Sequence, residues 1–219
     1  MKRKERYEKI IDWFQKNMSV AESELHYGNP YELLVAVILS AQCTDIRVNI
    51  VTPDFFKKYP NSKLLAKANS EDVFELIRSI SYPNSKTKHL TAMAQMLEND
   101  FGGTVPDNVS DLQKLPGVGI KTANVVASIV YGKPVIAVDT HVFRVSHRTG
   151  LADESDKTPE KVEKKLEKNI PEKLRAVSHH WLILHGRYVC TARSPHCYDC
   201  GINKYCQYFE NNFQMKIND

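Results

Sequence analysis

Apolar residues recur at helical spacing along most of this chain, and this pattern limits the folds that are open to it. The clearest case is the segment 4–18, where five apolar residues form one stripe among lysines and glutamates: Tyr7, Ile10, Ile11, Phe14 and Met18. The one convincing β-branched run, Val135–Val138, is too short to build a sheet. The sequence therefore predicts an all-α fold.

Capping residues and glycines indicate where several of these helices begin and end. Residues 31–40 follow Asn29-Pro30 and form an apolar run that predicts a buried helix. Ser70 is expected to cap a second helix, and Ser85 a third helix that ends at Gly102-Gly103. The first half of the chain is thus expected to be a succession of short helices.

A tight glycine turn separates the next two helices. Residues 110–115 predict a short helix, which Pro116-Gly117-Val118-Gly119 interrupts. Beyond the turn, apolar residues at i, i+3, i+4 and i+7 predict another helix: Ala123, Val126, Ala127 and Val130. The two glycines let the backbone approach a ligand and leave amide groups at a helix N-terminus, where an anion such as phosphate is favoured. The alternative is a plain turn between two helices.

Lys121 lies in the first turn of the helix that follows. A cation at this end opposes the helix macrodipole, which costs stability, so its presence calls for an explanation. The alternative is that the side chain extends into water, as most surface lysines do. Together with the glycine turn, the lysine favours a ligand-binding role for this segment.

The second half of the chain carries two further helical patterns. Asp139-Thr140 is expected to cap a helix that runs through Arg148. Over 153–175 acidic and basic residues interleave, and three apolar residues keep a four-residue spacing: Val162, Leu166 and Ile170. This pattern is typical of a solvated helix that docks by one narrow edge, and no function is assigned to its charges. A domain boundary is expected near Gly132-Lys133-Pro134.

Composition and charge limit the class of protein. The chain is 42% hydrophobic and 26% charged, which is typical of a globular protein, and its net charge of +4 permits a polyanionic partner without requiring one. Leu33–Leu39, the longest apolar run, is far shorter than the roughly 20 residues that span a bilayer, and no export signal is visible. We expect an intracellular, cytoplasmic protein. Cys43, which stands alone, is expected to be a small buried residue.

Four cysteines crowd near the C-terminal end: Cys190, Cys197, Cys200 and Cys206. Separated by six, two and five residues, their thiolates can converge on one metal centre or cluster. Zinc is the alternative, but four-cysteine zinc sites usually pair two short knuckles, and only Cys197 and Cys200 form one. A cluster with four thiolates carries negative charge, which three nearby cations could partly offset: Arg187, Arg193 and Lys204.

Four segments carry a distinctive combination of motifs: 115–124 with the glycine turn and lysine, 138–144 with the aspartate, 180–187, and the cysteine loop 190–206. Together they resemble the endonuclease III family of helix-hairpin-helix DNA glycosylases. The resemblance extends from about Asn29-Pro30 to Cys206, in the family's order and spacing. It implies that the four cysteines hold a [4Fe-4S] cluster.

The resemblance also implies a domain organisation of two helical lobes flanking a DNA-binding cleft. One lobe would be a helical barrel of residues 22–134 that contains the hairpin 115–121. The other would combine 1–21 with 135–219 and carry the cluster loop. The implied partner is damaged double-stranded DNA, at the nucleoid and without a membrane, and the implied state is a monomer.

Individual residues receive roles from the same resemblance. Lys121 matches the family's nucleophilic lysine and Asp139 its catalytic aspartate. Gln42 matches the residue that fills the gap left by an extruded base. The remaining expected DNA contacts are the hairpin residues that hold a phosphate and three side chains elsewhere: Gly117, Val118, Gly119, His141, Arg187 and Arg193.

One loop departs from the family's pattern. Where the family commonly has Gly-Leu-Tyr ahead of Asn-Ser-Lys, this chain has Ser81-Tyr82-Pro83. Tyr82 could stack in the duplex as a wedge, while Pro83 could reshape the loop.

These features lead to an expected function: a bifunctional DNA glycosylase and abasic-site lyase that removes oxidised pyrimidines through a lysine Schiff base and β-elimination. One alternative is a mismatch adenine glycosylase of the same superfamily. Such enzymes generally lack a lysine at the position of Lys121 and carry an extra domain, for which the few residues after Cys206 leave no room. A non-catalytic DNA-binding iron-sulfur protein would need neither Lys121 nor Asp139. An electron carrier would devote more of its chain to the cluster.

Overall fold

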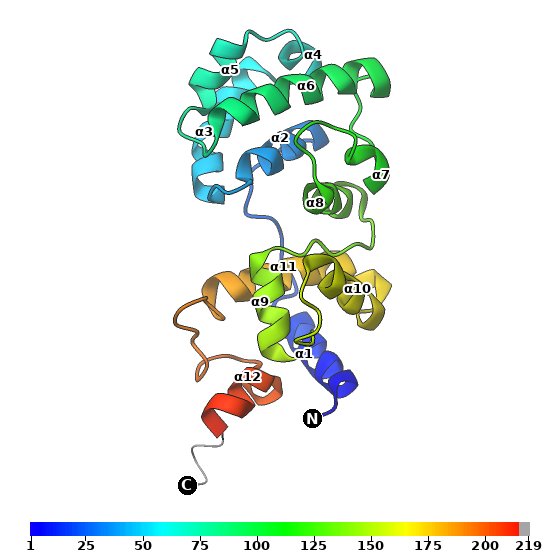
Figure 1. Cartoon of the computed structure of the whole chain (residues 1–219), viewed down its shortest axis with the longest axis vertical. Coiled ribbons are helices and arrows are strands. Elements are labelled where there is room, and N and C mark those ends of the chain that lie inside the picture. Colours follow the sequence, from blue (N-terminus) through cyan, green and yellow to red (C-terminus); the bar gives the residue numbers. More distant parts are fainter. Residues whose placement is uncertain (215–219) are drawn as a thin grey trace. The chain divides into compact units, whose positions relative to one another are not determined.

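A computed structural model describes residues 1–214, and within this range every regular element is a helix (Figure 1). The prediction of an all-α fold is confirmed. The chain divides into two compact units: Ser23–Lys133, and Met1–Glu22 with the chain from Pro134 onward. The division expected from the resemblance differs from this one by a single residue at each crossing.

The unit of residues 23–133 contains seven helices: α2 (Pro30–Ser40), α3 (Asp45–Lys58), α4 (Ser62–Leu65), α5 (Ser70–Ile77), α6 (Pro83–Phe101), α7 (Val109–Leu112) and α8 (Ile120–Tyr131). α2 is almost wholly apolar because it packs against α3, α6 and α8. No helix among residues 1–214, α2 included, is both long and apolar enough to cross a membrane. Asparagine or threonine side chains cap five of the seven: Asn29, Thr44, Asn61, Asn69 and Asn108.

The other unit is built from both ends of the described chain. Its α-helices are α1 (Arg3–Asn17), α9 (Thr140–Thr149), α10 (Pro159–Asn169), α11 (Arg175–Tyr188) and α12 (Gln207–Phe209). Two 3-10 helices, Glu172–Leu174 and Asn203–Tyr205, and a π-helix, Glu210–Gln214, complete it. The apolar stripe of α1 packs with residues of α9, α10 and α11 in one core. Phe14 stacks on Trp181 with ring centroids 5.7 Å apart.

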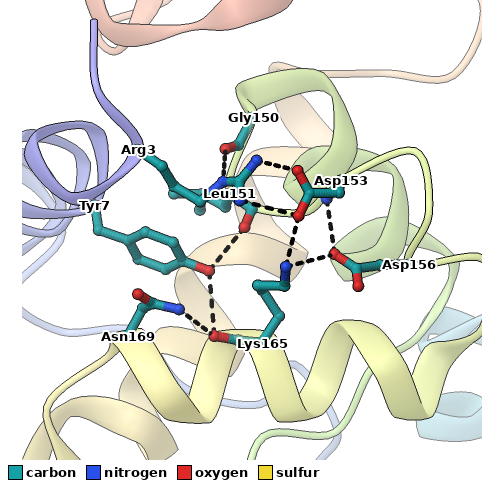
Figure 2. Close-up of polar contacts among 8 residues, drawn as sticks. All are labelled: Arg3, Tyr7, Gly150, Leu151, Asp153, Asp156, Lys165 and Asn169. Carbon is teal, nitrogen blue, oxygen red and sulfur yellow. Dashed lines mark hydrogen bonds and ion pairs between the residues drawn. The ribbon is translucent and has the colours of Figure 1, made fainter.

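A polar network joins α1 to the segment after α9 and to α10 (Figure 2). Arg3 forms an ion pair with Asp153, and its Nη1 donates to Asp153 Oδ2 at 2.9 Å. Lys165 Nζ lies 2.5 Å from the same carboxylate oxygen and 3.3 Å from Asp156 Oδ2. Some of the charged residues that interleave over 153–175 therefore form ion pairs that hold the elements of this unit together.

Two helix starts differ from their predictions. Ser70 is the first residue of α5 rather than its cap, because the Asn69 side chain accepts the Glu71 N–H instead. Ser85 lies inside α6, which begins at Pro83 after a left-handed Tyr82. Asparagine is at least as good a cap as serine, and proline is favoured in the first turn, so the earlier residue prevails in each case.

Three further expectations need correction. The short helix predicted over 110–115 is α7, which starts one residue earlier and ends at Leu112, because Asn108 caps it. The helix expected within 153–175 is limited to α10, since Pro159 opens it at the N1 position and Pro171 follows its end. Cys43 is half-buried rather than buried, because it lies in the turn between α2 and α3 and not on the apolar face of α2.

Candidate active site and cysteine pocket

The glycine turn joins α7 to α8. Gly117 has φ +80°, and a Cβ at this position would lie 2.8 Å from His89 Cβ, so only glycine fits without strain. The Leu115 and Val118 side chains are buried, and the Val118 N–H donates to the Leu115 carbonyl at 3.0 Å. A Cβ added at Gly119 would meet nothing within 4 Å. The turn is thus anchored by apolar side chains while its glycine backbone stays open.

No side chain caps the start of α8, since its N-cap is Gly119. The first N–H groups of this helix are left without intrahelical partners, which makes them available to an anion. Lys121 is the second residue of α8, in the first turn as predicted, and its side chain is exposed. Within residues 1–214 no side chain pairs with its ammonium group. The structure therefore places an unpaired amine next to an uncapped helix N-terminus.

Asp139 is the N-cap of α9, as predicted. Its Oδ1 accepts hydrogen bonds from the backbone N–H groups of His141 and Val142, both at 2.8 Å. Both bonds use one oxygen, so within the described chain Oδ2 has no hydrogen bond. The carboxylate is half-buried at a helix N-terminus, where a negative charge is favoured. One carboxylate thus caps a helix and still offers an oxygen to a ligand.

Close packing of α9 on α11 fixes His141. A Cβ at Gly186 would lie only 2.9 Å from His141 Cβ, so the two helices approach where α11 has no side chain. Arg144 Nη2 lies 3.2 Å from His141 Nδ1 and donates to the Gly186 carbonyl at 2.7 Å. Arg144 Nε also donates to the Cys190 carbonyl at 3.1 Å. The residue after the Asp139 cap is therefore connected to the start of the cysteine loop.

The four C-terminal cysteines line one pocket, together with residues of α9, α11 and the last helices: Thr149, His185, Val189, Pro195, His196, Ile202, Asn203, Tyr208 and Phe209. Burial raises the pKa of the Cys200 thiol to about 11 and also raises the pKa values of Cys197 and Cys206. Bare thiolates are disfavoured in such a pocket, whereas metal cations would stabilise them. The chemistry of the pocket therefore fits a thiolate-bound metal group.

Two basic side chains contact the sulfur atoms. Arg148 Nη1 lies 3.6 Å from Cys190 Sγ, and His185 Nε2 lies 3.6 Å from Cys200 Sγ. Burial lowers the pKa of His185 to about 4, so its ring is neutral at pH 7. Among residues 1–214 no three histidine, cysteine or acidic side chains are arranged to hold a single metal ion.

Sequence reasoning missed Arg148 as the cation beside the sulfurs. It expected Arg187, Arg193 and Lys204, of which Arg187 is half-buried in α11 while Arg193 and Lys204 are exposed. Arg148 is supplied by α9, and it also donates to the carbonyls of Thr191 and Ala192. No local pattern relates this arginine to a loop more than forty residues later.

Gln42 and Tyr82 share an uncommon backbone conformation. Their φ values are +55° and +56°, and no other non-glycine residue of the described chain has a positive φ. Both side chains are exposed, and Tyr82 reaches 64%. The left-handed region costs about 1–2 kcal/mol for a residue with a side chain, and such strain is common at functional sites. The loop 81–83, which departs from the family's pattern, has an unusual backbone, because Pro83 is the first residue of α6 and directly follows the left-handed Tyr82.

The candidate residues fall into two groups. The hairpin, Lys121, Gln42 and Tyr82 belong to the unit of residues 23–133. The other unit contains Asp139, His141, the two arginines expected to contact DNA and the four cysteines. Each unit thus carries one of the two residues for which a catalytic role is expected.

Known proteins are similar to this one over nearly its whole length. Residues 35–172 match the HhH-GPD superfamily of base excision DNA repair proteins. The chain is 47% identical to Endonuclease III of Rickettsia prowazekii (strain Madrid E) over 205 residues, which cover 94% of this chain and 96% of that protein. It is 42% identical to Endonuclease III of Escherichia coli (strain K12), over 92% of this chain and 94% of that one.

Solved structures agree with the sequence relatives. A trapped Endonuclease III-DNA covalent intermediate matches with a TM-score of 0.91 and 42% identity, over 96% of this chain and 99% of that chain. A non-covalent Endonuclease III-DNA complex also matches with a TM-score of 0.91, at 41% identity, over 98% of this chain and the whole of the other.

Proposed function

This chain belongs to the endonuclease III family of HhH-GPD base excision DNA repair proteins, and from this premise we propose which residues perform its reaction. It is a DNA glycosylase and abasic-site lyase. We propose oxidised pyrimidines in double-stranded DNA as its substrates. The observation that carries the assignment of residues is the unpaired Lys121 beside the uncapped N-terminus of α8.

The hairpin would hold the DNA backbone. The open glycine backbone of Gly117-Val118-Gly119 and the first amides of α8 can donate hydrogen bonds to one phosphate group. In the other unit, Arg187 and Arg193 would contact further phosphates, and His141 would contact the DNA next to Asp139. Such contacts fix the position of the enzyme without reading the base sequence.

Lys121 would be the nucleophile that acts on a nucleotide rotated out of the duplex. Its Nζ lone pair bonds to C1′ of the deoxyribose while the bond between C1′ and the base breaks. The base leaves with that electron pair and takes up a proton. Loss of a proton from Nζ and opening of the sugar ring then give an imine between Lys121 and C1′. Removal of a proton from C2′ expels the 3′ phosphate, which cuts the strand by β-elimination.

Lys121 must be neutral to attack, and an exposed lysine amine carries a proton at neutral pH. The free protein leaves this amine in water. The dipole at the start of α8 opposes the ammonium by only about 0.3–2 kcal/mol. Enclosure by bound DNA, which removes water from the amine, would have to supply the larger part of the free energy needed to remove its proton.

Asp139 would stabilise the opposite charge. The sugar becomes cationic as the base leaves, and a carboxylate about 4 Å away at an effective dielectric constant near 20 contributes on the order of 4 kcal/mol. The Oδ2 atom is suited to this role because both cap hydrogen bonds use Oδ1. Capping and catalysis can therefore coexist in one side chain.

We propose that Cys190, Cys197, Cys200 and Cys206 hold a [4Fe-4S] cluster. Their raised thiol pKa values and the pocket they line support a bound metal group, and their spacing favours a cluster over a single zinc ion. When bound, the cluster supplies a fixed cross-link for loop 190–206 and a centre capable of one-electron transfer. Purified protein should be yellow-brown and contain iron and sulfide. Stoichiometric zinc without iron in anaerobically prepared protein would contradict this assignment.

An incision assay tests the function directly. Three duplexes are compared, containing thymine glycol, an adenine mismatch with oxidised guanine, or no damage, and each is incubated with and without borohydride. We expect cleavage and a trapped covalent complex only with thymine glycol. Release of adenine from the mismatch without trapping would identify the mismatch glycosylase, and binding without any product would identify a non-catalytic DNA-binding protein. An enzyme with this substrate is expected to be found at the nucleoid.

A further inference from the structure

One buried lysine contacts the turn that precedes Gln42. Lys86 lies in the first part of α6 and is only 5% exposed. Its Nζ donates to the Leu39 carbonyl at 2.7 Å and to the Ala41 carbonyl at 2.6 Å. Ala41 directly precedes Gln42, so the ammonium group holds the backbone on which the left-handed Gln42 is built.

The same residue is bonded to the second left-handed position. The Lys86 N–H donates to the Tyr82 carbonyl at 3.1 Å, which is the first hydrogen bond of α6. Through its backbone and its side chain, Lys86 thus joins the two loops that carry Gln42 and Tyr82. Both loops belong to the unit of residues 23–133.

The bond to Leu39 also has a local physical reason. Leu39 lies in the last turn of α2, whose final carbonyls have no partner within the helix. A cation at a helix C-terminus is favoured by the macrodipole, and a charged donor makes a stronger hydrogen bond than a neutral one. Lys86 therefore completes the end of α2 where a Gly or Asn cap would ordinarily suffice.

This arrangement is costly, so it calls for more than a helix cap. Lysine is almost never fully buried, and burial lowers the pKa of Lys86 by disfavouring its charge. Glycine at positions 42 and 82 would relieve the strain in both loops. The chain instead keeps a buried ammonium and two strained, exposed side chains together. A requirement on the relative placement of those two side chains accounts for all three features.

We propose that Lys86 is a positioning residue. It fixes the placement of the Gln42 side chain relative to that of Tyr82, so that both enter the duplex together when a nucleotide is extruded. The inference rests on the proposed function, because it needs a duplex that is opened. Lys86 itself would touch neither the base nor the sugar. A lysine with a purely structural role would instead affect the stability of the unit and leave the coupling between the two loops unchanged.

The test uses a duplex in which 2-aminopurine lies opposite a tetrahydrofuran abasic analogue, which cannot be cleaved. The fluorescence of 2-aminopurine reports whether side chains enter the base stack. The affinity of the protein for this duplex is compared with its affinity for an undamaged duplex. The variants are Lys86→Met, Lys86→Arg, Gln42→Ala and the double variant Lys86→Met/Gln42→Ala. Two neighbours in α6 serve as controls: Thr87→Val, which changes a buried hydroxyl without a hydrogen-bond partner in the described chain, and Lys88→Met, which removes an exposed charge.

We expect Lys86→Met to lose most of the fluorescence change. Its preference for the abasic duplex should fall by about 10- to 100-fold, because a buried charge-assisted bond is lost. The double variant should be no worse than the more severe single variant, since both act on one placement. Lys86→Arg should lose less than Lys86→Met, and both controls should behave as wild type. A folded Lys86→Met with wild-type fluorescence, or effects that multiply in the double variant, would overturn the inference.

Amide hydrogen exchange gives a second readout that covers the case in which Lys86→Met does not fold. In Lys86→Arg, the amides of residues 40–43 and those of Ser81, Tyr82, Asn84 and Ser85 should exchange faster together, while the centres of α2 and α6 stay protected. Faster exchange in one loop alone, or in neither, would refute the link. Failure of the proposed function looks different, because wild-type protein would then give neither a borohydride-trapped complex nor a fluorescence change.

Discussion

The starts of α8 and α9 carry the two proposed catalytic residues, and they are built in opposite ways. At α9, Asp139 makes two hydrogen bonds of 2.8 Å to the helix that it begins. At α8, the N-cap is a glycine, and Lys121 is exposed with no partner in the described chain. In the proposed mechanism, the group that forms a covalent bond is the one left free, and the group that holds a charge in one place is the one fixed by the fold.

The difference extends to the supporting residues. The hairpin before α8 is anchored by buried Leu115 and Val118 and leaves its polar backbone open. α9 is held along its length by Arg144 and Arg148, which bond to carbonyl groups at the end of α11 and in the cysteine loop. The comparison therefore predicts that changes at α8 affect chemistry or binding with little loss of stability, unless they touch the anchor.

The largest effect is expected from Lys121→Gln. Because the amine is the proposed nucleophile, strand cleavage and borohydride trapping should fall by at least about 10³-fold. Because the side chain is exposed and unpaired, the free energy of unfolding should change by less than about 0.5 kcal/mol, and binding to damaged duplex should persist. The loss is measured by quantifying borohydride trapping on an abasic-site duplex. Lys133→Gln, which lies beyond the far end of α8, serves as the control. Undiminished trapping would assign the nucleophile to another residue.

Asp139→Asn should give the next largest effect. Loss of the charge should slow base release by about 10²- to 10³-fold, as the estimated stabilisation of the cationic sugar implies. Asparagine caps a helix about as well as aspartate, so stability should hardly change, whereas Asp139→Ala should also lose about 1 kcal/mol. Single-turnover base release and urea unfolding of both variants separate the roles. A full rate in Asp139→Asn would reduce this carboxylate to a helix cap.

Substitutions at the two hairpin glycines should separate DNA binding from the stability of the turn. Gly119→Ala adds a methyl group to open space, so the fold should survive while affinity for an uncleavable abasic duplex falls by about tenfold. Gly117→Ala forces a left-handed alanine against His89 and should destabilise the protein by more than about 1 kcal/mol. Binding isotherms and thermal unfolding test the pair. Equal stability of the two variants would show that the turn is not anchored as described.

The smallest effect is expected at the opposite end of α9, where a bonded network has no proposed part in catalysis. The hydrogen bond from Lys165 and the charge of Arg3 hold the pKa of Asp153 below its usual value. This stabilisation is present above the unfolded pKa of 3.8 and is lost as the pH falls through the lower folded value. Asp153→Asn should cost less than about 1 kcal/mol at pH 7, because the groups are partly exposed.

Urea unfolding at a series of pH values measures that prediction. The difference between wild type and Asp153→Asn should shrink as the pH falls below about 4, and strand cleavage at pH 7 should be unchanged. A loss of cleavage would mean that bonds at the far end of α9 also control the Asp139 cap.

Sequence patterns predicted the elements that depend on neighbouring residues. The apolar stripe of α1, the glycine that ends α6 and the Asp139 cap of α9 are all local signals, and each appears as expected. Ser70 was wrong as a cap because the asparagine before it competes for the same helix. No helix was predicted over the residues of α3. This helix contains Pro53, and proline is unfavourable in the interior of a helix.

The contacts that sequence patterns missed join residues far apart in the chain. Lys86 meets carbonyl groups more than forty positions earlier, and Arg148 meets sulfur and carbonyl groups more than forty positions later. Spacing therefore indicated neither. The roles of Lys121 and the cysteines came from the family resemblance, since the turn and the loop spacing each left a plain alternative open.

The placement of α1 with the end of the described chain has a consequence for biosynthesis. Arg6 Nε donates to the Tyr205 carbonyl at 2.8 Å, across 199 positions of sequence. A ribosome that adds about 5–20 residues per second needs roughly 10–40 s to make the chain between these partners. Residues 23–133 can fold during that interval, but the apolar face of the first helix has no core to join. Helix α1 is therefore made before its partners in this unit, and its apolar face stays exposed until they have been synthesised.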